Sequence, residues 1–233
     1  MSASGDMRAP AALLLSLVPI VLGIAVAAAT PSRDGEEDAP AGDVPREDGS
    51  ELIGKPAPSW KELRWLEREP LELESLRGKT VLVRWWTRGC SYCVASAPVI
   101  EALHEKYRER GLVVVGVYHP KPRPRPVEDG EVARSAKKLG LRFPIAIDAH
   151  WKALRRWWLD VPGRRFTSVS FLIDRAGRIR WVHPGGEYHP SDDPEHAACD
   201  ASYRELMKLV PELLAEGDER QEDGEAAEEA ARE

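Results

Sequence analysis

The 233-residue sequence predicts a single α/β domain with a mixed central β-sheet covered by helices on both faces. Two runs rich in β-branched and aromatic residues, 80–86 and 112–118, have the composition of buried central strands. Apolar residues recur at helical spacing after each run. Later in the chain, segments 169–174 and 179–183 flank a glycine-containing connection of the kind found in hairpins. The resulting order, β-α-β-α-β-α-β-β-α, is that of an α/β domain.

The remaining elements follow from local patterns. The folded part is expected to begin at Leu52. Trp60, Leu63 and Trp65 then alternate with polar residues in the manner of a half-exposed hairpin. The turn 77–79 leads into the first central strand. Four helices are predicted: one from the segment after Cys90 to Gly111, one over 127–139 that ends at Gly140, one over 151–159 and one over about 201–215. A short strand is predicted over 143–147.

Both ends of the chain differ in composition from the domain. No charged residue occurs from Ala9 to Ser32, so this stretch is apolar enough to direct export and to enter a membrane. An acidic segment rich in proline and glycine follows, and the last residues are mostly acids and alanines. The predicted organisation is a signal peptide or N-terminal membrane anchor, a flexible linker, a folded domain and an acidic tail, at residues 1–30, 31–51, 52–215 and 216–233.

The overall charge excludes one class of partner. The formal net charge is −6, and no basic face with interleaved aromatic residues stands out among the 33 lysines and arginines. Nucleic acid is therefore not an expected partner. Export instead predicts a periplasmic or other extracytoplasmic location, where disulfides can persist.

The main chemical motif is Cys90-Ser91-Tyr92-Cys93, which lies between a predicted strand and a predicted helix. At a helix start, unpaired backbone N–H groups and the positive end of the helix dipole favour a thiolate. Cys93, three residues later, lies on the same helix face, so the two sulfurs can close and reopen a disulfide. A structural zinc site normally needs four ligands, and no second CxxC or paired Cys/His cluster stands out. The motif therefore favours a redox dithiol.

Several further motifs surround this dithiol. They are the segment Ile53-Gly54-Lys55-Pro56-Ala57-Pro58, the run from Leu76 to Val83, the triplet Trp85-Trp86-Thr87 and the proline Pro98. With the dithiol, they resemble the thioredoxin superfamily, and within it the exported TlpA/ResA-type thiol-disulfide oxidoreductases of the redoxin and alkyl hydroperoxide reductase-like group. The resemblance covers residues 52–215.

This resemblance implies a thioredoxin-like fold and an enzyme that exchanges disulfides with exported protein thiols. Cys90 would be the attacking thiol and Cys93 the resolving thiol. A membrane electron donor would serve as a further partner, and the N-terminal segment would hold the chain at the membrane if it is not cleaved. Neither a cofactor nor a resident metal is implied.

The sequence departs from this family at two positions. Gly89 stands where a tryptophan usually precedes the first cysteine, which predicts a more open surface around the thiolate. Thr167-Ser168 stands where the family has a cis-proline facing the dithiol. Because a cis peptide bond before a residue other than proline costs about 3 kcal/mol, a trans bond is expected there. Ser168 could offer its hydroxyl to the thiolate or simply continue the strand.

A thiol peroxidase, with antioxidant activity, is one alternative. Thr87-Arg88-Gly89-Cys90 matches the T-x-x-C pattern of peroxiredoxins, in which a hydroxyl and a cation act beside the thiolate. The proline expected four residues before the threonine is Val83. The arginine expected on the strand near Phe171 is absent, and Arg164 and Arg165 are the nearest upstream.

A copper(I)-binding or metal-delivery protein is the second alternative, with Cys90 and Cys93 as soft ligands and His119 or His183 as a third. The remaining histidines show no ligand spacing with one another. They are His104, His150, His189 and His196.

Cys199 leaves an odd cysteine in a chain predicted to be exported. Such a residue is a buried thiol, an intermolecular link or a reactive spare. A relay of electrons through Cys199 would require it to lie near Cys93.

Overall fold

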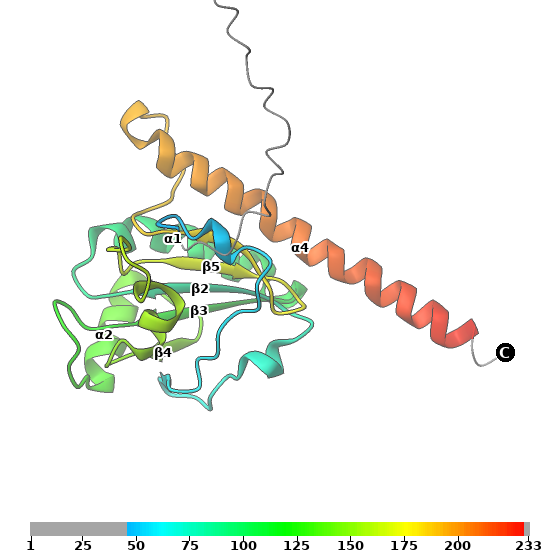
Figure 1. The fold of residues 1–233 in the computed structure, drawn as a ribbon, viewed down its shortest axis with the longest axis horizontal. Helices are drawn as coiled ribbons and strands as arrows, with labels where there is room; N and C mark the ends of the chain where they lie inside the picture. The colour runs from blue at the N-terminus through cyan, green and yellow to red at the C-terminus, as the bar shows by residue number, and fades with distance from the viewer. Residues whose placement is uncertain (1–45, 231–233) are drawn as a thin grey trace, which may run out of the picture. The chain divides into compact units, whose positions relative to one another are not determined.

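The computed structural model describes residues 46–230, which form a six-stranded mixed β-sheet in the order β1-β4-β3-β2-β5-β6 (Figure 1). The central strand β2 pairs parallel with β3 and antiparallel with β5. β3 and β4 are parallel, whereas β1 and β6 pair antiparallel with their neighbours. The predicted mixed sheet is thus confirmed. The strands are β1 Arg64–Trp65, β2 Thr80–Trp86, β3 Leu112–Tyr118, β4 Ile145–Ile147, β5 Ser170–Ile173 and β6 Ile179–His183.

The helices follow the predicted order with shifted ends. They are α1 Ser91–Tyr107, α2 Asp129–Leu139, α3 Lys152–Leu154 and α4 Ala197–Ala230. α2 ends at Gly140 as expected, because Gly140 takes the left-handed conformation with φ 73°. The helix predicted over 151–159 is a short α3 followed by a π-helical turn, Arg155–Leu159. α4 continues beyond residue 215, so most of the predicted acidic tail is helical.

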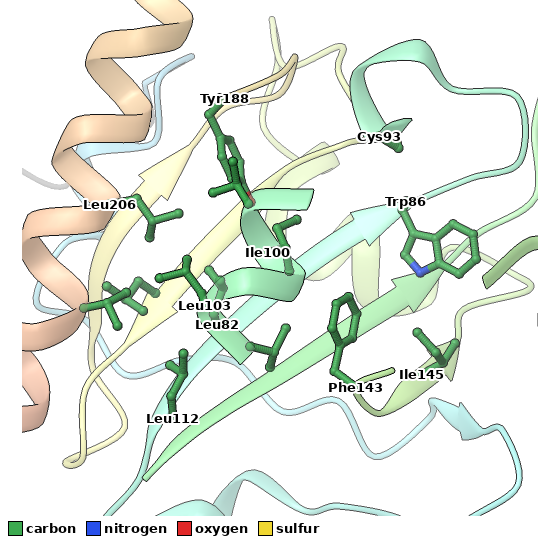
Figure 2. Close-up of a cluster of buried hydrophobic side chains, with 14 of the residues drawn as sticks. Leu82, Trp86, Cys93, Ile100, Leu103, Leu112, Phe143, Ile145, Tyr188 and Leu206 are labelled. Carbon is green, nitrogen blue, oxygen red and sulfur yellow. The ribbon is translucent and has the colours of Figure 1, made fainter. Parts of the chain in front are cut away.

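Side chains of the central strands point alternately to the two faces of the sheet and pack into two apolar cores, one on each face. Leu82 and Trp86 of β2 pack with α1, α2 and α4 in the core shown in Figure 2. Val83 and Trp85 point to the other face, which the segment before β2 and the α3 region cover. There the Trp157 ring lies 5.3 Å from the Trp85 ring and 6.0 Å from the Trp60 ring. These contacts confirm helices on both faces of the sheet, and they bury Trp157 and Trp158 in the second core.

The prediction of a hairpin around residues 60–65 is wrong. β1 instead pairs with β4, with Arg64 opposite Ile147 and Trp65 opposite Ala146. Trp60, Leu63 and Trp65 are all buried in the second core. Burial of these large side chains against α3 and the sheet decides the pairing, and this depends on residues far along the chain.

Residues 46–51, which the sequence assigns to the linker, lie against the domain. The buried Arg164 side chain donates from Nε to the Arg46 carbonyl oxygen over 2.9 Å and pairs with Glu51. Gly49 is buried beside Trp158 with φ 77°, and a Cβ atom at this position would lie 2.8 Å from the Trp158 ring. A polar segment is thus held without apolar side chains of its own.

The predicted signal peptide or anchor and the rest of the predicted linker lie outside the described residues. Within residues 46–230, no helix combines the length and the apolar character needed to cross a membrane.

Two buried histidines lie at strand ends. His119 follows β3 and contacts the Trp151 ring edge-on at 5.3 Å, and burial lowers its pKa to about 4. His183 ends β6 and lies 5.0 Å from the Tyr188 ring. Burial, and then the nearby Arg84 charge, lower the pKa of His183 to about 3. Both imidazoles are therefore neutral in the folded protein at neutral pH.

These histidines predict a loss of stability in mild acid. Between pH 6.5 and about 4 the unfolded chain binds protons that the folded chain does not, so the free energy of unfolding falls as pH falls. His183 contributes up to about 1.4 kcal/mol per pH unit. His183→Phe should flatten this dependence in urea unfolding at pH 7, 6, 5 and 4 with the disulfide intact, whereas exposed His150→Ala should not. Equal slopes for wild type and His183→Phe would contradict the account.

Candidate active site

Cys90 lies at the N-terminal end of α1. It is the N-cap residue, and its Sγ accepts a hydrogen bond from the Cys93 backbone N–H over 3.2 Å. The sulfur therefore occupies the place where α1 presents unpaired donors and its positive dipole end, which favours a thiolate. Gly89 has φ 75°, a left-handed conformation that turns the chain from β2 into α1. Gly89 is exposed with no side chain over it, which agrees with the predicted open surface.

Cys90 and Cys93 form a disulfide, with their Cα atoms 5.2 Å apart. The two cysteines differ in access. Cys90 is half-buried, whereas Cys93 is only 4% exposed and belongs to the core that contains Trp86 (Figure 2). A partner from solution can therefore reach the Cys90 sulfur but not the Cys93 sulfur.

Behind Cys93 lies a buried cation that the sequence analysis missed. Arg84, in the middle of β2, is 2% exposed and lines the same cavity of ≈ 10 Å³ as Trp86 and Cys93. No carboxylate lines this cavity, and no ion pair of Arg84 occurs within the described part of the chain. Burial lowers the pKa of Arg84. A positive charge in this position favours a thiolate at Cys93.

The segment after β6 holds Arg84 in place. The Gly186 carbonyl oxygen accepts from the guanidinium over 2.7 Å, and the guanidinium carbon lies 5.1 Å from the Tyr188 ring centre. The same segment is tied to α1, because the Tyr188 N–H donates to Ser96 Oγ over 3.0 Å. Arg84 also donates to Ser170 Oγ of β5 over 3.2 Å.

Thr167 and Ser168 are buried just before β5. The cis peptide bond of the described chain is Lys121–Pro122, so the Thr167–Ser168 bond is trans, as expected. Ser168 Oγ accepts from the Gly186 N–H over 3.3 Å. Ser168 thus joins this strand to the segment that carries Gly186, which fits a serine that supports the backbone.

Thr87 and Arg88 line a pocket of ≈ 340 Å³ together with Cys90. Thr87 is buried and Arg88 is exposed. Two further cations of α2, Arg134 and Lys138, complete a basic rim. The one acid of this pocket, Glu131, accepts a hydrogen bond from the Tyr118 hydroxyl over 2.9 Å and pairs with Arg125. The hydrogen bond from Arg125 lowers the pKa of Glu131.

Exposed apolar side chains also lie near the dithiol, and one of them, Val94, lines the same pocket as Cys90. Tyr92 is 41% exposed, Val94 56% and Phe166 52%. The Tyr92 and Phe166 rings meet edge-on at 6.3 Å, which places the segment before β5 beside the motif. Exposed apolar side chains grouped at a reactive centre are typical of a protein-docking surface.

The contacts of Arg164 count against the peroxidase alternative. β5 carries no arginine, and Arg164 is buried in its ion pair with Glu51. Thr87 does line the Cys90 pocket, but among the described residues neither Arg164 nor Arg165 lines it.

The copper(I) alternative finds no converging third ligand. Over the described side chains, the group of converging metal-ligand atoms contains neither Cys90 nor Cys93. His119 and His183 pack against aromatic rings instead.

The structure places two of the other histidines beside Cys199. His189 and His196 do come together, with ring centres 5.2 Å apart, although they show no ligand spacing in the sequence. Cys199 is a free thiol whose Sγ accepts from the His189 N–H over 3.2 Å. Burial raises the pKa of Cys199, so this thiol is a poor nucleophile for a relay.

Comparison with known proteins identifies the family. Residues 52–198, more than half of the chain, match Redoxin, and the chain belongs to this family. Protein DipZ of Mycobacterium tuberculosis is 33% identical over 132 residues, which cover 55% of this chain and 18% of DipZ. Thiol-disulfide oxidoreductase ResA of Halalkalibacterium halodurans is 33% identical over 121 residues, which cover 52% of this chain and 62% of ResA. The chain thus spans less than two thirds of each relative.

A solved structure shares the fold. The thiol-disulfide isomerase from Corynebacterium glutamicum superposes with a TM-score of 0.51 at 26% identity, covering 68% of this chain and 96% of that chain. The predicted thioredoxin-like architecture is confirmed by this likeness and by the sheet order.

The buried Arg84 charge predicts a measurable effect on the dithiol. Arg84→Gln keeps a hydrogen-bond donor for the Gly186 carbonyl but removes the cation, so the reduced Cys93 thiolate loses stabilisation. The reduction potential should fall by about 30 mV for each 1.4 kcal/mol lost. It can be measured in dithiothreitol buffers by thiol alkylation. Arg108→Gln, at the exposed far end of α1, should leave the potential unchanged, and an unchanged Arg84→Gln potential would exclude this role.

Proposed function

We propose that this member of the redoxin family is a thiol-disulfide oxidoreductase that exchanges its Cys90–Cys93 disulfide with cysteines of other proteins. The observation that carries the proposal is the pairing of a reachable Cys90 at the start of α1 with a buried Cys93. The names of two relatives, ResA and the Corynebacterium glutamicum isomerase, support the same chemistry.

In the oxidising direction, a partner thiolate attacks Cys90 Sγ. The Cys90–Cys93 bond breaks, a mixed disulfide forms at Cys90, and Cys93 leaves as a thiolate. A second partner thiolate then attacks the partner sulfur of the mixed disulfide and releases Cys90. The partner loses two electrons and two protons as its disulfide forms, and the chain's dithiol gains them. The reducing direction is the reverse, with the Cys90 thiolate as attacking group and Cys93 as resolving group.

Two groups lower the cost of the thiolates in these steps. The start of α1 stabilises negative charge at Cys90, and the Arg84 guanidinium does so at Cys93 from within the core. A more stable thiolate is a better leaving group. Both sulfurs are therefore suited to leave as well as to attack.

The surface around Cys90 suggests the kind of partner segment that docks. Tyr92, Val94 and Phe166 offer exposed apolar side chains, and Arg88, Arg134 and Lys138 form a basic rim around the pocket that Val94 also lines. A partner cysteine with apolar and acidic residues beside it fits this surface. The partner is thus a protein segment rather than a small thiol alone.

The place of action is part of the proposal. The uncharged stretch near the N-terminus supports export to the periplasm or another extracytoplasmic compartment, with residues 1–30 as signal peptide or membrane anchor and the residues after it as a tether. Exported protein thiols or disulfides are then the partners, and a membrane electron donor returns the pair to its working state. In this proposal the folded domain is residues 52–215, with residues 46–51 packed against it, and the acidic tail is residues 216–233, most of which continue α4.

The roles of the two cysteines can be separated by substitution. Cys93→Ser should accumulate mixed disulfides with a cysteine-containing substrate protein, because no resolving thiol remains, and Cys90→Ser should lose exchange. Non-reducing gel electrophoresis with mass spectrometry detects the trapped species. Cys199→Ser is the control and, with wild type and variant both freed of metal by a chelator, should exchange at the wild-type rate. Full multiple turnover by Cys93→Ser would contradict the two-cysteine mechanism.

The basic rim predicts a dependence on substrate charge. Arg134→Glu together with Lys138→Glu should slow exchange with a peptide that carries acids beside its cysteine, roughly tenfold at low ionic strength. The difference should shrink in high salt. Stopped-flow kinetics with acidic and basic peptides measure it. The control variant Lys106→Glu with Arg110→Glu, at the other end of α1, makes the same change in net charge. An equal loss of exchange rate in this control would show that the basic rim does not bind the acidic peptide.

A further inference from the structure

A second cluster of reactive side chains lies between β6 and α4, and the proposed exchange does not use it. It contains a carboxylate, two imidazoles and a thiol. One ligand atom from each lies within 4.8 Å of the other three, and the members are Glu187, His189, His196 and Cys199.

Local structure brings these four groups to one place as two pairs. Glu187 and His189 flank Tyr188, which is fully buried, so both project away from the core. His196 ends the 3-10 turn Pro194–His196, and Cys199 follows three residues later in α4, one helical turn away.

The loop between the two pairs is held by hydrogen bonds. The Asp193 carboxylate accepts from the Glu195 N–H over 2.9 Å. The Ser191 N–H donates to Asp200 Oδ1 over 3.2 Å, which ties the loop to α4.

The distances within the cluster are those of groups that face a common point. Glu187 Oε1 lies 3.3 Å from His196 Nδ1 and 3.8 Å from His189 Nε2. His189 Nδ1 lies 3.0 Å from the Pro190 carbonyl oxygen, which can only accept a hydrogen bond. Nδ1 therefore carries the proton, and the lone pair of Nε2 faces the cluster. Such a backbone partner commonly orients a metal-binding histidine.

We propose that Glu187, His189, His196 and Cys199 bind a zinc ion in a four-coordinate site. Thiolate sulfur, imidazole nitrogen and carboxylate oxygen are the ligand atoms that zinc takes in tetrahedral sites. Calcium and magnesium take oxygen ligands, and copper(I) selects soft sulfur ligands over carboxylate. A thiolate and a carboxylate together balance the charge of Zn²⁺. With four protein ligands the site is closed, as structural zinc sites are.

The position of this site gives the ion a defined effect. Glu187 and His189 adjoin Gly186 and Tyr188, the residues that hold Arg84 behind Cys93. An ion bound to both pairs fastens this segment to the start of α4. Zinc therefore stabilises the segment that holds Arg84 behind Cys93, without contacting the sulfur of Cys90 or of Cys93.

Zinc binding to the full chain tests the proposal. The metal-free protein, with its Cys90–Cys93 disulfide closed so that the dithiol cannot bind metal, is titrated with Zn²⁺ against a chromophoric chelator. The expected result is one ion per chain, with affinity reduced at least tenfold in His196→Ala and in Cys199→Ser. His150→Ala, an exposed histidine outside the cluster, should bind as wild type does. Circular dichroism confirms that each variant is folded.

Cobalt substitution gives an independent readout. Co²⁺ in the wild-type site should show a sulfur-to-cobalt charge-transfer band and the visible bands of tetrahedral coordination, and Cys199→Ser should lose the charge-transfer band. The proposal is overturned if the oxidised protein binds no stoichiometric zinc, or if binding and spectrum are unchanged in both His196→Ala and Cys199→Ser. It is equally overturned if zinc binds only after the Cys90–Cys93 disulfide is reduced.

Discussion

The buried guanidinium of Arg84 is the constraint on which the organisation of the site depends. Removing this charge from water costs several kcal/mol, and no carboxylate within the described chain neutralises it. The cost is offset by hydrogen bonds to Gly186 and Ser170 and by the face of Tyr188. These partners come from β5 and from the segment after β6. Burial of Arg84 therefore requires β5 and the segment after β6 to be in place. The same contacts form the side of the core that lies behind Cys93.

The contacts around Arg84 and the start of α1 give the two sulfurs different surroundings and different roles. Cys90 lies where solvent, an apolar patch and a basic rim meet, whereas Cys93 lies in the core beside a fixed cation. Positive charge on both sides of the disulfide favours its reduced, thiolate form relative to a pair in neutral surroundings. The buried carboxylates Glu101 and Asp148 do not line the Cys93 cavity. Glu101 binds Arg142, and Asp148 accepts from the backbone N–H groups of Lys152 and Leu154. Among the described residues, Arg84 is thus the charged side chain that lines this cavity.

Strong local patterns allowed much of this architecture to be predicted from the sequence. β2 and β3 were predicted to the residue because their apolar runs are continuous, and Cys90 was placed at a helix start by the strand-turn-helix order. β1 was missed because two residues carry little pattern and its partner β4 lies about eighty residues later. Arg84 was overlooked because one charge within an apolar strand does not reveal its partners. The Glu187 to Cys199 cluster escaped notice because each half contributes only two ligand-type residues, and a loop joins them.

The central claim is that Cys90 and Cys93 form a reversible redox pair, and a redox titration of the full chain tests it most directly. The protein is equilibrated in glutathione or dithiothreitol buffers, quenched in acid and alkylated, and the modified cysteines are assigned by mass spectrometry. The account predicts one two-electron transition in which Cys90 and Cys93 become modified together, while Cys199 is modified in every buffer under denaturing conditions. If the pair failed to cycle, or if Cys90 titrated with Cys199 instead, the account would be contradicted.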